Sequence, residues 1–219
     1  MKLIAIDTTT EACSAALLVN DTIKEQYELA PRQHAELILP MIDSLLSDAG
    51  LNLGQLDAIA YTCGPGAFTG LRIGAGVAQG LAFSSDLPVI QVSTLATLAQ
   101  GNRGKAQFIA TAIDARMNEI YFAIYRDAEI VELTGAEIVD CAENIRLTES
   151  GSYFGAGSGW ARYHEPLSAI FGQNLTGFDA NQYPHAKNAA KIAGVYYKQG
   201  RICDAADVAP VYIRNKVTG

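Results

Sequence analysis

The 219-residue sequence has few of the features that mark membrane, secreted or metal-binding proteins. No apolar run approaches the roughly 18–20 residues that a helix needs to cross a bilayer. The N-terminal stretch MKLIAIDTTT is too short in apolar residues for a signal peptide, because Asp7 interrupts it. No C-x-x-C pair occurs among the four cysteines, which are Cys13, Cys63, Cys141 and Cys203. We therefore expect a cytoplasmic protein with reduced, buried thiols and no membrane association.

Motifs of several catalytic classes are also missing. The three histidines, His34, His164 and His185, are far apart and show no H-x-x-x-H spacing, so we expect no metal site. No serine stands in a G-x-S-x-G elbow, which leaves a serine hydrolase unsupported. Residues 62–82, TCGPGAFTGLRIGAGVAQGLA, contain no lysine for a Walker loop and no G-x-G-x-x-G. Both standard phosphate-binding loops are therefore excluded.

Charge is distributed unevenly along the chain. The net charge is −7, but residues 185–219 carry a surplus of four positive charges, which leaves −11 on the other 184 residues. A protein that binds nucleic acid by itself usually presents a basic face on its main body. We therefore expect no autonomous binding of RNA.

Hydrophobic periodicity predicts an α/β chain whose plan occurs twice. In the first half we expect two strands around a polar turn at Asp7–Glu11, a third strand near residues 22–30 and further strands at 56–63 and 88–92. Helices are expected at 34–50, starting or kinked near Pro40, at 70–83 with Thr69 as N-cap, and at 94–100.

The polar stretch GNRGK at residues 101–105 marks a boundary, after which FIATAID and NEIYFAIYRDAE repeat the opening pair of strands. A loop GAGSG at 155–159, a helix at 186–199 and a short strand at 211–213 follow. We expect two related lobes, residues 1–102 and 103–219, with a cleft between them. In one version of this division the final segment packs back on the first lobe.

The glycines of residues 62–82 form two stripes along the predicted helix. Gly70, Gly74, Ala78 and Ala82 share one stripe at a spacing of four, whereas Gly76 and Gly80 share another. Glycine inside an exposed helix costs about 1 kcal/mol per residue, so a close backbone neighbour is expected. That neighbour is either the protein's own sheet or a second subunit.

Two polar clusters end matching strands of the two halves. Asp7, Thr8 and Thr9 form either a polar turn or a turn that orients a metal-bound phosphate. The second cluster begins at Asp114 and is either an ion-pair network or the part of a nucleotide site that the second lobe contributes. In the second alternative, Gly155 and Gly157 approach a nucleotide.

Several stretches, in this order, resemble the bacterial TsaB (YeaZ) family: LIAIDTTTEACSAAL, HAELILPMI, GPGAFTGLRIGAGVAQGLA, DARMNEIYFAIY and APVYIRNKV. The resemblance extends from Leu3 to Val217. It implies an α/β fold of actin-like ATPase (ASKHA) architecture with two ribonuclease-H-like lobes and a cleft. Members of the family often continue beyond the last residues of this chain, so we expect a few further C-terminal residues.

The resemblance implies a scaffold role in making threonylcarbamoyladenosine, the base next to the anticodon in tRNAs that read codons beginning with adenine. The implied partners are TsaD as a heterodimer, TsaE as an ATPase in a ternary complex, and a second copy of the chain when TsaD is absent. The tRNA is then reached only through the complex. No cofactor is implied beyond weak binding of ATP or ADP, with or without magnesium.

Catalytic TsaD carries a metal-binding V-N-H-x-x-A-H motif where this sequence has Thr94 and Leu98 in place of the two histidines. Neither side chain replaces imidazole as a ligand, so a non-catalytic chain is expected. The resemblance places the partner interface on the two helices before and within the glycine-rich stretch. The candidate residues are Leu37, Ile38, Met41, Ile42, Leu45, Leu71, Gly74, Val77, Ala78 and Leu81.

Two alternatives remain beside the scaffold. One is an ATPase or phosphotransferase that holds a nucleotide in the cleft with Asp7, Thr8, Thr9, Asp114, Gly155 and Gly157. The other is a metalloprotease, which the missing metal-ligand motifs disfavour.

Overall fold

The computed structural model describes residues 1–147 and 149–213. The chain forms two compact units. The first comprises Met1–Thr97 and Pro184–Val211, and the second comprises Leu98–Tyr183 with Tyr212 and Ile213. The basic residues Arg214 and Lys216 and the end of the predicted APVYIRNKV motif lie outside the described residues. Within the described part of the chain, no helix is both long and apolar enough to cross a membrane.

A five-stranded sheet forms the first unit, in the order β3-β2-β1-β4-β5. Strands β1, β2 and β3 are antiparallel neighbours, whereas β4 and β5 run parallel to β1. The bounds are Lys2–Asp7 for β1, Ala12–Val19 for β2, Thr22–Leu29 for β3, Ala58–Gly64 for β4 and Val89–Ser93 for β5. The three inner strands are buried almost throughout, as expected for a sheet with helices on both faces.

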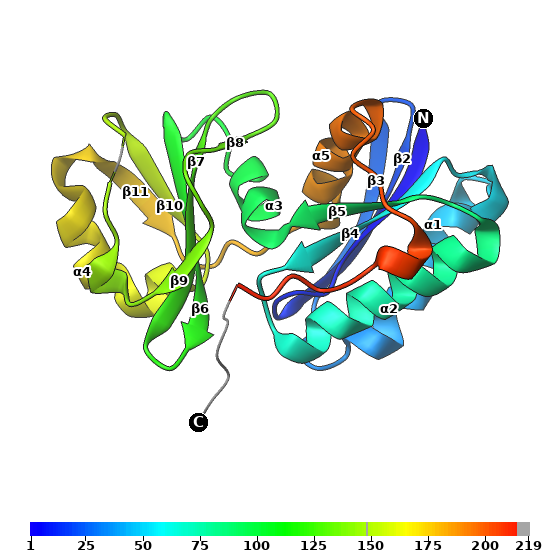
Figure 1. Cartoon of the computed structure of the whole chain (residues 1–219), viewed down its shortest axis with the longest axis horizontal. Helices are drawn as coiled ribbons and strands as arrows, with labels where there is room; N and C mark the ends of the chain where they lie inside the picture. Colours follow the sequence, from blue (N-terminus) through cyan, green and yellow to red (C-terminus); the bar gives the residue numbers. More distant parts are fainter. Residues whose placement is uncertain (148, 214–219) are drawn as a thin grey trace. The chain divides into compact units, whose positions relative to one another are not determined.

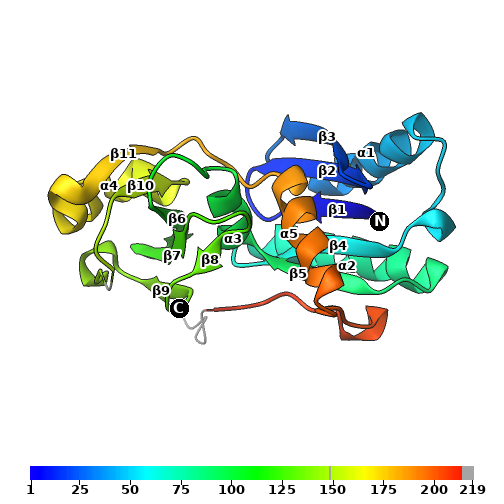
Figure 2. The ribbon, with the colours of Figure 1, turned by 90° about the horizontal axis from the view of Figure 1, so that it is seen from above.

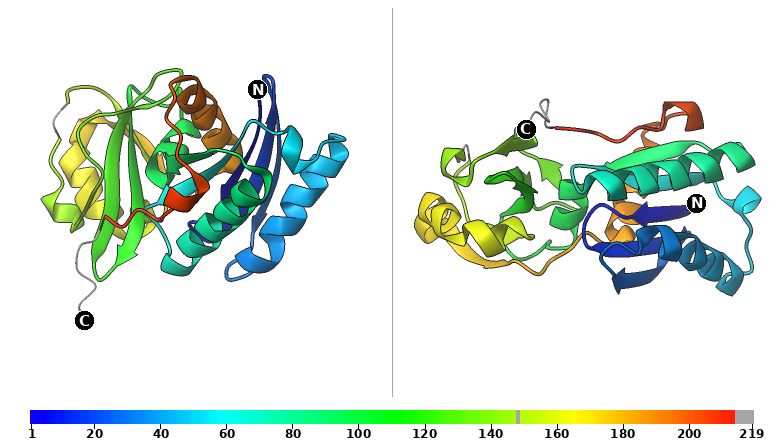
Figure 3. Two further views of the ribbon diagram at one scale, coloured as in Figure 1. Left: turned by 45° about the vertical axis from the view of Figure 1, so that its right-hand side comes forward. Right: turned by 90° about the horizontal axis from the view of Figure 1, so that it is seen from below.

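Helix α5 covers one face of this sheet, and α1 and α2 cover the other (Figures 1, 2 and 3). The helical segments of the unit are α1 (His34–Asp48), η1 (Leu53–Gln55), α2 (Phe68–Ser85), α5 (Ala186–Lys198) and η4 (Ala205–Asp207). Helix α1 begins well before Pro40 and continues through it. Helix α2 begins at Phe68 after Ala67 and has no side-chain cap, so the expected cap at Thr69 is wrong.

The second unit repeats the same plan. Its sheet has the order β11-β10-β6-β7-β8, with β9 also paired to β7. Strands β7, β8 and β9 run antiparallel to their neighbours, and β10 and β11 are added in parallel beyond β6. A central strand with antiparallel successors on one side and parallel ones on the other is therefore common to both units. This shared order confirms the predicted internal echo.

The elements of the second unit are β6 (Phe108–Arg116), β7 (Glu119–Arg126), β8 (Glu132–Leu133), β9 (Ile138–Asp140), η2 (Ala142–Asn144), β10 (Tyr153–Ala156), α4 (Gly159–Phe171), η3 (Gly172–Asn174) and β11 (Leu175–Asp179). Its core is aromatic: Trp160 and Phe171 of α4 pack with centroids 5.6 Å apart against the sheet. The indole of Trp160 donates a hydrogen bond of 2.9 Å to the carbonyl of Ala110.

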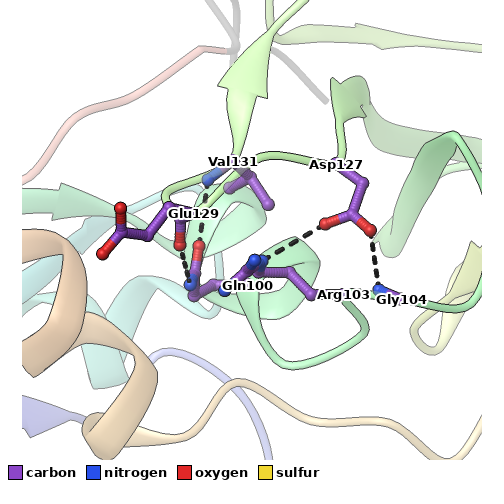
Figure 4. Close-up of polar contacts among 6 residues, drawn as sticks. All are labelled: Gln100, Arg103, Gly104, Asp127, Glu129 and Val131. Carbon is purple, nitrogen blue, oxygen red and sulfur yellow. Dashed lines mark hydrogen bonds and ion pairs between the residues drawn. The ribbon is translucent and has the colours of Figure 1, made fainter.

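The division between the units falls earlier than the predicted boundary at residue 102. Helix α3 (Thr94–Gln100) crosses it, and the residues after Thr97 are bound to the second unit. The amide of Gln100 donates to the carbonyl of Glu129 and accepts from the N–H of Val131, each at 3.0 Å (Figure 4). The carboxylate of Asp127 stabilises the turn after α3, because it accepts bonds from the guanidinium of Arg103 at 3.2 Å and from the N–H of Gly104 at 2.8 Å. The polar stretch that reads as a linker is thus part of the second unit.

The C-terminal end of the chain also departs from the expected lobe at 103–219. Helix α5 packs on β1 and β2, so residues 184–211 belong to the first unit. Residues 203–211 then run past β5 and α2, where Tyr61 donates to the carbonyl of Ala209 at 2.8 Å. In the described residues no strand forms at 211–213. Val211 instead makes a single backbone bond of 2.7 Å to Cys63.

Candidate functional site

The turn between β1 and β2 holds the first set of predicted site residues. Asp7 ends the central strand, and Thr8 and Thr9 follow it into the turn. All three are at most 1% exposed. The turn is buried because the first half of α2 packs directly against it.

Glycines of α2 and of the preceding loop make this contact possible. Thr8 Oγ1 donates to the carbonyl of Gly70 at 2.7 Å, and the N–H of Ala67 donates to the carbonyl of Thr9 at 2.8 Å. A Cβ atom on Gly70 would lie 2.0 Å from the Thr8 carbonyl oxygen, and one on Gly66 would lie 2.3 Å from that of Thr9. Real Cβ atoms do not approach so closely, so only glycine allows the helix to close on the turn.

The carboxyl group of Asp7 is enclosed by this packing. It accepts bonds of 3.2 to 3.3 Å from the N–H and hydroxyl of Thr9. Burial raises its pKa from 3.8 to about 6, although the hydroxyl of Thr62, the bonds from Thr9 and the charge of His185 each lower it. At neutral pH the first unit therefore holds an ionised carboxylate in its interior at a cost in stability.

The remaining predicted nucleotide contacts lie in the second unit. Asp114 is 17% exposed and accepts a bond of 2.9 Å from the N–H of Arg116. Gly155 lies in strand β10 and Gly157 in the turn before α4, and both are buried. Of the loop expected at 155–159, only residues 157 and 158 lie outside a strand or helix. A Cβ atom on Gly155 would lie 2.3 Å from the indole of Trp160, and one on Gly157 would lie 2.5 Å from the Ala112 carbonyl oxygen. Both glycines are required by the packing of their own unit.

Thr94 and Leu98, at the positions of the TsaD histidines, are both buried. Leu98 packs against Gly157, and the hydroxyl of Thr94 has no hydrogen-bond partner among the described residues. No cluster of three or more metal-ligating side chains occurs in residues 1–147 and 149–213.

The predicted partner interface requires a correction. Most of its members are buried in the core of the first unit, because the apolar stripes of α1 and α2 that contain them pack against the sheet. Those buried members are Ile38, Met41, Ile42, Leu45, Leu71, Gly74 and Ala78. The other three, Leu37, Val77 and Leu81, are partly buried at the edge of this core.

The outer stripe of α2 is different. Arg72, Gly76, Gly80 and Phe83 are all exposed, and Phe83 is 81% exposed. Nothing lies within 4 Å of a Cβ atom built on Gly76 or Gly80. These two glycines therefore serve no contact within the described chain. Residue spacing predicted this second stripe but could not tell which of the two faces the solvent.

A hollow of about 580 Å³ lies between α1, η1 and α2, and Leu81 lines it from α2. Leucines form half of its wall, and its polar members are Asp43, Ser47 and Asn52. Leu39, which lines it from α1, is 50% exposed. We call the outer stripe and the hollow together the α1–α2 face, which is apolar apart from Arg72 and the polar members of the wall.

A polar cluster that sequence reasoning missed caps the N-terminus of α5. Glu25 of β3 accepts bonds from the ring of His185 at 3.1 Å and from the N–H and ammonium of Lys187, each at 3.0 Å. These bonds keep the pKa of Glu25 below its usual value despite burial, which acts in the opposite direction. Tyr27 stacks on His185 with ring centroids 4.2 Å apart. The partners lie about 160 residues apart, so no local signal reveals them.

Known proteins are similar to this chain in sequence and in fold. A family model described as TsaD, tRNA N6-adenosine threonylcarbamoyltransferase, matches residues 18–197. The tRNA threonylcarbamoyladenosine biosynthesis protein TsaB of Haemophilus influenzae is 41% identical over 100% of this chain and 95% of its own. The Escherichia coli protein of the same name is 40% identical over 99% of this chain and 96% of its own.

Solved structures agree with these relatives. The structure titled YeaZ from Pseudomonas aeruginosa superposes with a TM-score of 0.90 at 43% identity, covering 96% of this chain and 99% of that one. A second Pseudomonas aeruginosa structure, described as similar to peptidase YEAZ, gives a TM-score of 0.91 at 42% identity over 97% and 99%. The two units are thus the lobes of an actin-like fold, and the chain belongs to the TsaB (YeaZ) family of tRNA threonylcarbamoyladenosine biosynthesis proteins.

Proposed function

We propose that this chain is a non-catalytic subunit that assembles with TsaD and TsaE for threonylcarbamoyl transfer to tRNA in the cytoplasm. The observation that carries the proposal is the pair of open glycines, Gly76 and Gly80, on the exposed stripe of α2. Glycine in a helix interior lowers stability relative to alanine, and no contact within the described chain requires it at Gly76 or Gly80. Close approach of a partner helix would require small residues at these positions, and the exposed Phe83 and Leu39 supply apolar area for the contact.

The same face serves self-association when TsaD is absent. A surface shared by two partners makes the homodimer and the heterodimer mutually exclusive, so addition of TsaD dissociates the homodimer. The non-catalytic assignment is supported by the side chains of Thr94 and Leu98, which cannot bind a metal as imidazole does.

The decisive experiment places a charge on the open stripe. Gly76→Arg adds a guanidinium where nothing in the described chain obstructs it, so the variant should remain folded. We expect it to abolish TsaD binding and tRNA modification in a reconstitution with purified TsaD and TsaE. Ala169→Arg, at an exposed position of α4, is the matched control and should leave both unchanged. Full activity of Gly76→Arg would contradict the proposal.

Val77→Arg gives a second test on the same helix. Val77 is partly buried against the core, so this variant requires a check of folding by thermal unfolding before its binding is interpreted. The competing ATPase or phosphotransferase function is tested separately. Titration of the isolated chain with ATP and ADP, with and without magnesium, combined with measurement of phosphate release, would reveal it.

A further inference from the structure

The turn between β6 and β7 has an unfavourable backbone. Arg116, Met117 and Asn118 have φ angles of 62°, 55° and 61°, so three successive residues other than glycine adopt the left-handed conformation. Asparagine tolerates this conformation, whereas arginine and methionine rarely do. A two-residue hairpin turn of this kind strongly favours Asn-Gly or Asp-Gly. The sequence RMN at this position thus departs from what the hairpin prefers.

The surrounding structure holds the turn in place from both sides. Asp114 accepts bonds from the N–H of Arg116 at 2.9 Å and from its guanidinium at 3.4 Å. Arg162 of α4 donates a bond of 3.0 Å to the side-chain oxygen of Asn118. The N–H of Asp114 donates in turn to the hydroxyl oxygen of Ser158 at 3.2 Å. Three residues outside the turn, Asp114, Ser158 and Arg162, therefore hold its shape.

Packing does not account for the choice of residues. The side chain of Arg116 is 77% exposed, Met117 is 63% exposed, and Arg162 is also exposed. Glycine at 116 would remove the backbone strain without removing any buried contact. Arg116 adopts the strained conformation although its side chain is mostly exposed, and strained residues of this kind cluster at binding sites.

The chemistry of the turn favours an anion with several oxygens. Arg116 and Arg162 each use one guanidinium nitrogen for the bonds described above, out of five N–H donors per side chain. The remaining donors can bind a phosphate group in the bidentate manner that arginine prefers. Asp114 and Glu119 lie at the same turn and limit the attraction, so the site suits one or two phosphates rather than a long anionic tract.

We propose that the β6–β7 turn, through Arg116 and Arg162, contacts the phosphate backbone of the RNA that is modified. Figure 1 shows this turn at the lower tip of the β6–β7 hairpin. The proposal rests on the proposed function, because the net charge of −7 makes RNA binding by the isolated chain unfavourable and the contact forms within the assembled complex. It goes beyond the scaffold role by giving this subunit a direct contact with RNA.

The test measures tRNA affinity of the complex reconstituted with TsaD and TsaE at several salt concentrations. The double variant Arg116→Ala with Arg162→Ala should bind tRNA about tenfold more weakly. The slope of log affinity against log salt should also decrease by about 1 for each arginine removed. Arg126→Ala, an exposed arginine at the opposite end of β7, is the control and should change neither.

Two further readouts separate the outcomes. Arg116→Gly should raise the thermal midpoint of the isolated chain, because strain is relieved, and yet weaken tRNA binding by the complex. Size-exclusion chromatography establishes whether each variant still assembles. Failure of the unmodified chain to assemble would contradict the proposed function. Normal assembly with unchanged tRNA affinity and salt slope would overturn the RNA contact, and so would a variant that loses assembly itself, which would make the turn a protein contact.

Discussion

Helix α2 carries two sets of glycines with opposite structural roles. The inner set, Gly70 and Gly74 together with Gly66 before the helix, lies against Thr8 and Thr9, where a Cβ atom would collide. The outer set, Gly76 and Gly80, faces open space. Packing within the chain therefore requires glycine on one side of the helix and does not require it on the other.

The difference teaches how to separate residues kept for folding from residues kept for association. Glycine in a helix costs about 1 kcal/mol relative to alanine wherever its small size is unused. The inner glycines offset this cost through a close contact within the unit, whereas the outer ones do not. Residues that lower stability without an internal contact are good candidates for a role outside the chain.

The largest expected effect comes from adding a methyl group where α2 packs against the turn between β1 and β2. Gly70→Ala places a methyl group 2.0 Å from the Thr8 carbonyl oxygen, so backbone must move, and we expect a loss of about 3 kcal/mol in the free energy of unfolding. Urea unfolding with a check of the m-value measures it. A loss below about 0.5 kcal/mol would show that the inner set is not tightly packed.

The buried carboxyl group beneath the inner set should give the next largest effect. Because the folded pKa of Asp7, about 6, exceeds the usual aspartate pKa of 3.8, this group contributes stability below pH 4 that is lost as the pH rises to 6. A shift of about two pKa units is worth about 3 kcal/mol. We expect Asp7→Asn to recover about 2 kcal/mol at pH 7.5, since its amide N–H₂ has to find acceptors.

This prediction is checked by urea unfolding between pH 4 and 8. The Asn variant should show a weaker decline of stability between pH 4 and 6 than the original chain. If the two pH profiles run parallel, Asp7 does not titrate in that range, and its burial is less complete in solution.

Thr8 tests the hydrogen bond that accompanies the close approach. Thr8→Val keeps the shape of the side chain but removes the hydroxyl that donates to the Gly70 carbonyl at 2.7 Å. We expect a loss of about 1 kcal/mol, measured by thermal unfolding. Thr69→Val, at an exposed position of the same helix, serves as the control with the same chemical change.

The smallest effect on stability, and the most informative one, is expected at the outer set. Gly76→Ala and Gly80→Ala should each raise the free energy of unfolding by about 0.7 kcal/mol, because alanine is the better helix former and has room. Both should weaken self-association in sedimentation equilibrium, since the added methyl groups keep a partner helix away. A gain in stability with undiminished association would remove the argument for the α1–α2 face.

Much of the fold could be predicted from sequence periodicity. The elements expected in the first unit and the opening strand pair of the second occur near their expected positions, but α4, β10 and β11 were not predicted. The two glycine stripes of α2 follow directly from a spacing of four. Burial shows that most of the predicted interface residues belong to the core. Ile38 and Leu71 are apolar and helical in spacing, but that pattern is typical of a core face as much as of a docking face.

By itself, the sequence determined the α/β plan, its repetition, the absence of standard phosphate loops and the family. These properties depend on local patterns and on motifs of adjacent residues. Only the tertiary structure decided which glycines of α2 face inward, that α5 returns to the first unit, and that Glu25 caps it from β3. The reason is physical: a helical period defines the faces of an element, whereas contacts between residues distant in sequence determine which face is covered. These contacts span 62 positions between Thr8 and Gly70 and 162 between Glu25 and Lys187.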